Sequence, residues 1–247
     1  MSGGPAARLF CFHHAGAGVS CFAAWQRVFG AAVEVVPVLL PGRDTRAREP
    51  RITGAEQLVA ELTARLGPLL DRPYAFYGHS LGGMVAYTLA RALDEAGAPG
   101  PDAVAVGALP PPHLPSPLLP ERLPPDAELL PWLVARGVLP PVAAAAEGGM
   151  WRRRVLPTLR DDLLLARALR ARADSALSCP MLAVAGRADT IAPAPLVARW
   201  RRYAPAGFRF LTLPGGHFFV RDPALPALLR DVLPGLVRTV RPESSST

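Results

Sequence analysis

The chain has 247 residues, half of them hydrophobic, which is enough to bury one full core, so we expect a single domain over residues 1–247. Its 27 basic residues, all arginine, exceed the 20 acidic ones and give a net charge of +7, which favours encounter with an acidic partner. The three cysteines lack CxxC spacing, which argues against a disulfide framework and a structural metal site. No apolar run of about 18 residues occurs, which argues against a membrane span, and we expect a cytoplasmic protein.

Short apolar runs alternate with helix-length segments along most of the chain. This alternation predicts the α/β class, with a mainly parallel sheet covered by helices on both faces. In such a sheet the functional groups gather on loops at the carboxyl ends of the strands. The predicted strands are Arg8–Phe12, Val33–Leu39, Tyr74–Tyr77, Ala103–Ala108, Met181–Ala185 and Phe208–Leu213, and the clearest helical segments are Gly54–Leu70, Leu81–Ala96 and Pro193–Tyr203.

One stretch interrupts this rhythm. From residue 110 to about 178 no strand pattern occurs, and a proline-rich part is followed by Ala, Leu and Arg in helical spacing. Because long insertions beside the functional edge of a sheet are commonly functional, we interpret the stretch as a helical lid over a cleft, the alternative being an ordinary helical layer. The tail, residues 241–247, is expected to be disordered.

The strongest local motif is Gly78-His79-Ser80-Leu81-Gly82, a GxSxG between the strand candidate PYAFY and a helical run. It resembles the nucleophile elbow of α/β-hydrolases, in which a strained strand-to-helix turn exposes the serine and requires glycine on both sides. The start of the helix also directs backbone N–H groups toward a developing oxyanion. We therefore predict an α/β-hydrolase fold with Ser80 as nucleophile.

A serine hydroxyl needs a base to remove its proton, and in this fold the base follows the serine and the acid along the chain. Only two histidines, His113 and His217, follow Ser80. His113 lies in a proline-rich segment, whereas His217 lies in PGGHFF, directly after the last predicted strand. Of the two, His217 is the better candidate, and we predict it as the base.

The base in turn needs a carboxylate that fixes its tautomer. Asp189 fits, since it lies in the loop after the strand candidate Met181–Ala185. The rival loop, after Ala103–Ala108, reads LPPPHLP and has no carboxylate. The predicted catalytic residues are therefore Ser80, Asp189 and His217.

The oxyanion hole is expected to use two backbone N–H groups. One belongs to Leu81, at the start of the helix, and the other to the loop after the first strand, where Ala15 is favoured over His14. His13 and His14 are neighbours in sequence, so their side chains should point in different directions, and no third ligand lies at a suitable spacing. We therefore expect no metal site. No cofactor is expected either.

Several motifs in combination resemble the type II thioesterases that accompany modular polyketide and nonribosomal peptide synthases. The matching segments are FCFHHAGAGVSCFAAW, VLLPGRDTRARE, YGHSLGGMVAY, GRADTIAPAPLVARW and PGGHFFV. The F-x-x-W that ends at Trp25, the LPGR around Arg43 and the GGHFF around His217 discriminate better than GHSLGG, which many hydrolases share. The match covers most of the chain outside the insertion.

The resemblance implies hydrolysis of acyl or peptidyl thioesters from the phosphopantetheine arm of an acyl or peptidyl carrier protein, with editing of aberrant or stalled chains. The alternatives are a product-releasing or cyclising thioesterase, a general carboxylesterase and a non-catalytic hydrolase-like module. The run Arg152–Arg154 is the densest basic segment and is a candidate docking patch for the carrier. We expect a monomer that binds neither nucleic acid nor a membrane.

Overall fold

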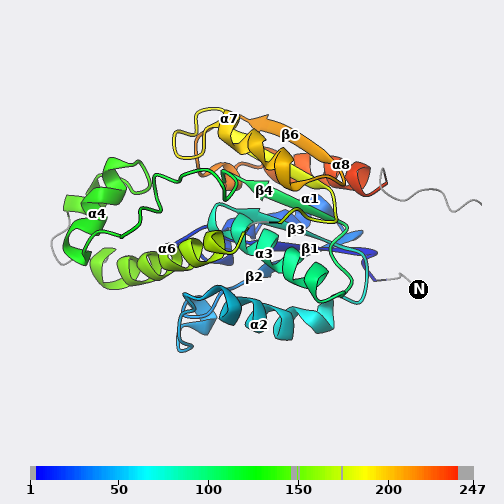
Figure 1. The fold of residues 1–247 in the computed structure, drawn as a ribbon, viewed down its shortest axis with the longest axis horizontal. Helices are drawn as coiled ribbons and strands as arrows, with labels where there is room; N and C mark the ends of the chain where they lie inside the picture. The colour runs from blue at the N-terminus through cyan, green and yellow to red at the C-terminus, as the bar shows by residue number, and fades with distance from the viewer. Residues whose placement is uncertain (1–3, 146–148, 150, 174, 239–247) are drawn as a thin grey trace, which may run out of the picture.

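The computed structural model describes residues 4–145, 149, 151–173 and 175–238, and the expected tail at 241–247 lies outside them. Its centre is a six-stranded sheet in the order β2-β1-β3-β4-β5-β6, in which every neighbouring pair is parallel (Figure 1). The predicted α/β architecture is thereby confirmed. The strands are β1 Ala7–Phe12, β2 Val33–Val38, β3 Tyr74–His79, β4 Ala103–Gly107, β5 Met181–Gly186 and β6 Phe208–Leu213.

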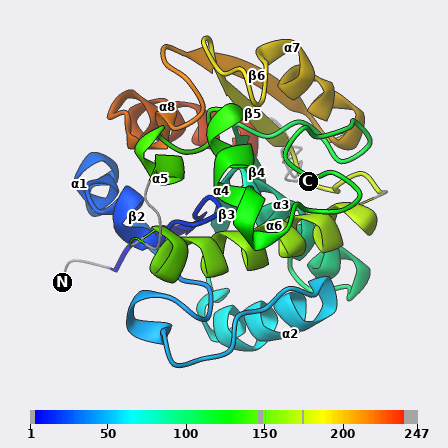
Figure 2. The same ribbon diagram turned by 90° about the vertical axis from the view of Figure 1, so that its left-hand side faces the viewer.

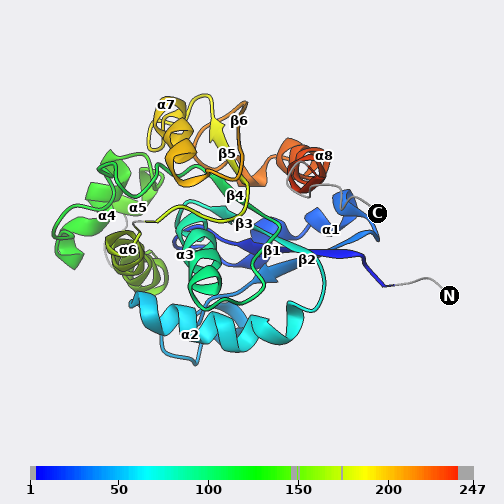
Figure 3. The ribbon, with the colours of Figure 1, turned by 45° about the vertical axis from the view of Figure 1, so that its right-hand side comes forward.

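Two apolar cores cover the two faces of the sheet. Alternate residues of β1 enter different cores, with Phe10 and Phe12 in one and Leu9 and Cys11 in the other, as the two-residue period of a strand requires. The first core contains α2 (Ala55–Leu66) and α3 (Leu81–Glu95), and the second contains α1 (Trp25–Phe29) and α8 (Ala224–Arg238) (Figure 3). Because both faces are covered, the central strands read as continuous apolar runs.

The stretch from residue 110 to 178 contains no strand among its described residues. It forms α4 (Asp126–Ala135), α5 (Val142–Ala145), a π-helical turn (Trp151–Val155) and α6 (Leu156–Ala171), which lie on the near side of the sheet in Figure 2. Leucines of α4 and α6 form a third, separate apolar cluster: Leu129, Leu130, Leu133, Leu156, Leu159 and Leu163. The first half of α6 thus packs against α4, while its second half joins the core beneath α3.

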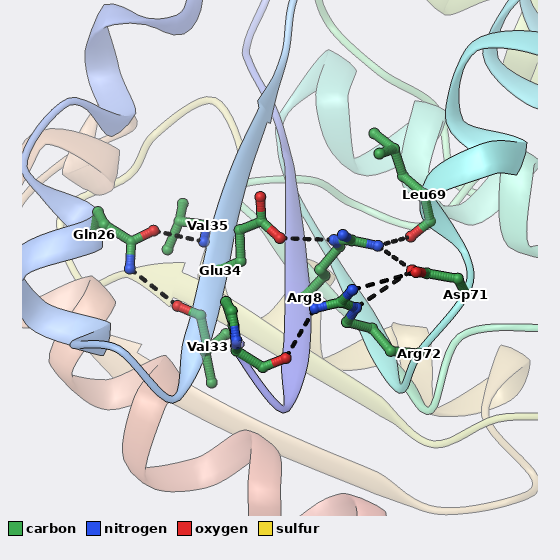
Figure 4. Close-up of polar contacts among 9 residues, drawn as sticks. Arg8, Gln26, Val33, Glu34, Val35, Leu69, Asp71 and Arg72 are labelled. Carbon is green, nitrogen blue, oxygen red and sulfur yellow. Dashed lines mark hydrogen bonds and ion pairs between the residues drawn. The ribbon is translucent and has the colours of Figure 1, made fainter. Parts of the chain in front are cut away.

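The edge strand β2 has its outward backbone groups partly covered by a side chain of α1. The Gln26 amide donates to the Val33 carbonyl at 3.0 Å and accepts from the Val35 N–H at 2.9 Å (Figure 4). On the other side of β2, Arg8 of β1 pairs with Glu34 at 2.8 Å. Since an uncovered edge is a template for pairing with another chain, the Gln26 contacts protect this edge of the sheet.

The ends of two predicted helices differ from expectation. The segment Gly54–Leu70 is α-helical only to Leu66 and continues as a 3₁₀ turn, Gly67–Leu69, because Pro68 has no N–H to continue the ladder. The segment Pro193–Tyr203 divides into α7 (Ala194–Val197) and a 3₁₀ helix (Ala198–Tyr203). In the latter, Trp200 and Tyr203 pack with ring centroids 5.4 Å apart, an i, i+3 contact that 3₁₀ geometry favours.

The remaining elements are three short 3₁₀ turns, Val19–Phe22, Asp44–Arg46 and Phe219–Arg221. Within the described part of the chain, no helix has the length and apolar character needed to cross a membrane.

Candidate active site

Ser80 lies at a sharp turn between β3 and α3. Its φ of +53° is unfavourable for a residue with a Cβ, as expected of a nucleophile elbow. The flanking glycines are required by space: a Cβ on Gly78 would lie 1.9 Å from the Gly82 carbonyl oxygen, and one on Gly82 would lie 2.1 Å from the Phe12 carbonyl oxygen. The GxSxG motif therefore folds into a turn that only glycine at both flanks permits.

The three side chains expected to act together lie in one row. The Ser80 Oγ is 3.3 Å from the His217 Nε2, and the His217 Nδ1 is 2.9 Å from the Asp189 Oδ2. The serine follows β3, the aspartate follows β5 and the histidine follows β6. Because all strands are parallel, their carboxyl ends share one edge, and this is how residues 137 positions apart come into contact.

Asp189 is buried, and both of its carboxylate oxygens have hydrogen-bond partners. Its Oδ1 accepts hydrogen bonds from the backbone N–H groups of Ile191 and Ala192, each at 2.8 Å, and its Oδ2 faces His217. Burial alone would raise the pKa of this carboxyl, but the hydrogen bonds from His217 and from the two backbone groups outweigh it and hold the pKa below its usual value. Asp189 is therefore ionised at neutral pH.

A further histidine, which the sequence reasoning did not assign, supports the His217 loop. His79 is fully buried, and its Nε2 donates to the His217 carbonyl oxygen at 2.7 Å while its Nδ1 accepts from the Tyr77 hydroxyl at 2.9 Å. Burial, and then the nearby His217 and His14, hold the pKa of His79 far below its ordinary value, so the ring is neutral with its proton on Nε2. A polar residue in a buried strand is the only sequence signal for this role.

The two residues whose backbone N–H groups are predicted for the oxyanion hole, Ala15 and Leu81, both line the cavity at Ser80. The loop after β1 adjoins the elbow because Phe12 pairs with Gly78 across the sheet. Among the described residues, neither the Ala15 N–H nor the Leu81 N–H has a hydrogen-bond partner, and both residues line the same cavity as Ser80. Both donors are therefore free to bind a ligand oxygen.

This cavity is small, at about 60 Å³, and mostly apolar. The stretch 110–178 supplies much of its wall, and His14, Ala15, Val138, Leu159 and Phe218 also border a neighbouring cavity of about 500 Å³. Only the larger volume is in the range of ligand pockets, about 300–1,000 Å³.

The other histidines have different surroundings. His13 is buried and its Nδ1 donates to the His14 carbonyl oxygen at 2.9 Å, and burial lowers the pKa of His14 to about 3. Among the described residues, no three His, Cys, Asp or Glu side chains form a group suited to a metal ion. His113 packs against Tyr203, with ring centroids 5.7 Å apart, and does not line the Ser80 cavity.

Known proteins resemble the chain over nearly its whole length. LgrE of Brevibacillus parabrevis, named as a linear gramicidin dehydrogenase, is 33% identical over 87% of this chain and 82% of its own length. RedJ, a thioesterase of the prodiginine pathway of Streptomyces coelicolor, is 34% identical, with a TM-score of 0.78 over 94% of this chain and 91% of RedJ. BorB, a type II thioesterase of the borrelidin biosynthetic cluster, is 26% identical, with a TM-score of 0.74 over 94% of each chain.

The model of the thioesterase domain family matches residues 7–234, which include every residue of the row described above. The resemblance noted from the motifs, to type II thioesterases, is thus confirmed. The chain belongs to the thioesterase domain family.

Proposed function

We propose that this enzyme hydrolyses acyl or peptidyl thioesters carried on the phosphopantetheine arm of carrier proteins, and that it removes aberrant or stalled chains in polyketide or nonribosomal peptide biosynthesis. The observation that carries the proposal is the Ser80–His217–Asp189 row, with hydrogen-bonding distances of 3.3 and 2.9 Å, beside an apolar cavity. The similarity to RedJ and BorB supports the substrate class.

In the acylation half, the Ser80 Oγ attacks the thioester carbonyl carbon while the His217 Nε2 takes the hydroxyl proton. The carbonyl oxygen becomes an oxyanion, which the N–H groups of Leu81 and Ala15 stabilise. The C–S bond then breaks, and the pantetheine thiolate receives the proton from His217. The product of this half is an ester on Ser80.

In the deacylation half, His217 takes a proton from water, whose oxygen attacks the acyl-serine carbonyl. Collapse of the second tetrahedral intermediate returns the proton to the Ser80 Oγ and releases a carboxylic acid. Asp189 stabilises the imidazolium in both halves and keeps the proton of the neutral ring on Nδ1, so that Nε2 remains the acceptor.

The stretch 110–178 would act as a lid. A cavity of about 60 Å³ beside Ser80 is too small for an acyl chain, since pockets that hold small ligands have volumes of about 300–1,000 Å³. A substrate therefore requires part of the stretch to move, or the neighbouring cavity of about 500 Å³ to join the first. Such gating is a common way to admit substrate and exclude water.

The proposed partner is an acidic carrier protein, to which the net charge of +7 is complementary. Arg152–Arg154, in the π-helical turn beside the larger cavity, are the proposed docking patch. We also propose a cytoplasmic monomer with no nucleic-acid or membrane partner. Light scattering of the purified protein tests the monomer, and charge reversal at Arg152–Arg154 with unchanged carrier affinity would remove the patch from the proposal.

Intact-mass analysis of carriers loaded with different acyl groups tests the function. The enzyme should convert loaded carrier to free-thiol carrier, and Ser80→Ala should lower the rate by about three orders of magnitude or more. Ser20→Ala, at an exposed position, is the control and should match the wild type. A much faster reaction on p-nitrophenyl esters than on loaded carriers would identify a carboxylesterase, and near-normal turnover by Ser80→Ala would refute the assignment.

A further inference from the structure

An acidic side chain lies in the middle of an apolar face of α6. Asp162 lies on the same side of the helix as Leu159, three residues before it, and Ala166, four residues after it, and Leu163 lies four residues after Leu159 on the same buried face. All three of these neighbours line the Ser80 cavity. Asp162 itself is 1% exposed, which for a carboxylate requires partners.

The partners of Asp162 come from two different loops of the sheet. Arg43, in the loop after β2, donates from Nη1 to Oδ2 at 2.8 Å and from Nη2 to Oδ1 at 2.7 Å. The Gly16 N–H, in the loop after β1, donates to Oδ2 at 2.7 Å. The same Arg43 also donates from Nη1 to the Ala17 carbonyl oxygen at 3.1 Å.

The ion pair therefore holds the residues on the C-terminal side of Ala15 at two points. Gly16 has a φ of +72°, and the Cδ1 of Leu159 lies 3.3 Å from the point where a Cβ would be. Thus α6 both contacts this loop and accepts its N–H. The Gly16 N–H and the Ala15 N–H belong to successive rigid peptide units that meet at the Ala15 Cα, so fixing the first leaves only the two backbone dihedrals of Ala15 to set the direction of the second.

We propose that Asp162 and Arg43 are positioning residues for the oxyanion hole: by binding the Gly16 N–H and the Ala17 carbonyl, they direct the Ala15 N–H toward the reacting carbonyl oxygen. The inference rests on the proposed function, in which Ala15 and Leu81 stabilise the oxyanion. It also divides the stretch 110–178 into two parts. Helix α6 belongs to the catalytic frame, and any opening for substrate takes place in the part before α6.

The other contacts of α6 agree with this division. Arg51, in the segment that precedes α2, pairs with Asp161 at 2.6 Å, and Glu56 of α2 pairs with Arg172 at the end of α6. By contrast, among the described residues the segment before α6 contacts it through the leucine cluster, through the exposed Asp126, which pairs with Arg160, and through hydrogen bonds from Arg160 and Arg170 to backbone carbonyls, but through no buried ion pair.

The test compares two double variants. Removing one partner of a buried ion pair leaves an uncompensated charge, whereas replacing both by apolar residues of similar size is often tolerated. Arg43→Met/Asp162→Leu therefore removes the acceptor for Gly16 while filling the space. Arg43→Gln/Asp162→Asn removes the charges but keeps an amide oxygen as that acceptor.

We expect the apolar pair to lower kcat by about 10- to 100-fold with KM changed less than about threefold, since the lost interaction acts in the transition state. The amide pair should recover most of kcat. The control is Arg51→Gln/Asp161→Asn, which alters the neighbouring ion pair between α6 and the segment before α2 without touching the loop after β1, and which should keep the wild-type kcat. A cooperative thermal unfolding transition will show that each variant is folded.

Labelling of Ser80 by a fluorophosphonate separates this inference from the proposed function, because the reagent needs the oxyanion hole but no carrier protein. If wild-type Ser80 is not labelled, the proposed function fails. If the wild type is labelled and the folded apolar pair is labelled equally fast, or if the amide pair is as slow as the apolar pair, the positioning role is overturned. Should the apolar pair not fold, Arg43→Gln/Asp162→Ala, which leaves a neutral, water-accessible gap, takes its place with the same expectations.

Discussion

Replacing Asp189 by asparagine would test whether the hydrogen bond between Asp189 and His217 sets the tautomer that His217 needs to act as the base. The Asp189 Oδ1 accepts from two backbone N–H groups, both at 2.8 Å. An asparagine would therefore place its carbonyl oxygen there, because its NH₂ group cannot face two donors. The NH₂ group would then lie against the His217 Nδ1, which must become an acceptor, and the ring proton would move to Nε2.

With its proton on Nε2, His217 cannot remove the proton from Ser80. A wrong tautomer of this kind costs about 10⁴ in kcat. This factor corresponds to about 5.5 kcal/mol in the activation free energy, at about 1.36 kcal/mol for each factor of ten. The loss should fall on kcat more than on KM, because Asp189 lies behind the histidine and does not line the cavity.

The assay is steady-state hydrolysis of an acyl-loaded carrier, with release of free thiol as the signal. Asp231→Asn, which changes an exposed carboxylate of α8 in the same way, is the control. A kcat within about tenfold of the wild type for Asp189→Asn would refute the reasoning, because the asparagine would then be compatible with a working base.

Three further outcomes follow from the site. His79→Phe, which leaves the His217 carbonyl without its donor, should lower kcat by about 10- to 100-fold with little change in KM, as measured by steady-state kinetics. The pKa of His14 is lowered to about 3, so this side chain stays neutral in the folded protein, whereas in the unfolded chain it takes up a proton below about pH 6.5. The folded state therefore loses stability as the pH falls. Between pH 7.5 and 5, His14→Gln should lose about 2 kcal/mol less stability than the wild type, as measured by urea titrations. Gly82→Ala, whose Cβ would overlap the backbone at the end of β1, should cost about 3 kcal/mol or more in the same titrations. Gly67→Ala, with open space around it and a helical φ of −45°, should be neutral or stabilising.

The sequence could predict the sheet and the row of side chains because the signals for them are local. Each buried strand is an apolar run, and Ser80 lies in a motif whose two glycines are dictated by the turn. The chain order of the fold then reduces the choice of base to two histidines, of which only His217 follows a late strand. The distances between these side chains required the structure.

Contacts between segments without a shared motif could not be predicted in this way. Arg43 and Asp162 are 119 residues apart, and His79 binds a backbone carbonyl 138 residues away. His79 stands out as a polar residue within an apolar strand, and Arg43 as part of the LPGR motif, but neither signal says which distant group the side chain contacts. The short helix α1 and the proline-containing α8 were also not predicted, since α1 has only five residues and Pro234 interrupts the helical pattern of α8.

The ion pairs of α6 suggest how the proposed lid, residues 110–178, could open for substrate while the oxyanion hole stays fixed. A hole stabilises the transition state only if its donors are oriented before the reaction, so the loop after β1 must stay in place while substrate enters. If the whole stretch 110–178 moved as one body, Asp162 would leave Gly16, and a buried Arg43 would lose the carboxylate that compensates its charge. Opening before α6 avoids that cost, since it separates leucine contacts, one exposed ion pair and hydrogen bonds from Arg160 and Arg170 to backbone carbonyls, which water can replace. If the stretch 110–178 acts as the proposed lid, the buried pair therefore makes opening before α6 less costly than movement of the whole stretch, and the oxyanion hole stays formed.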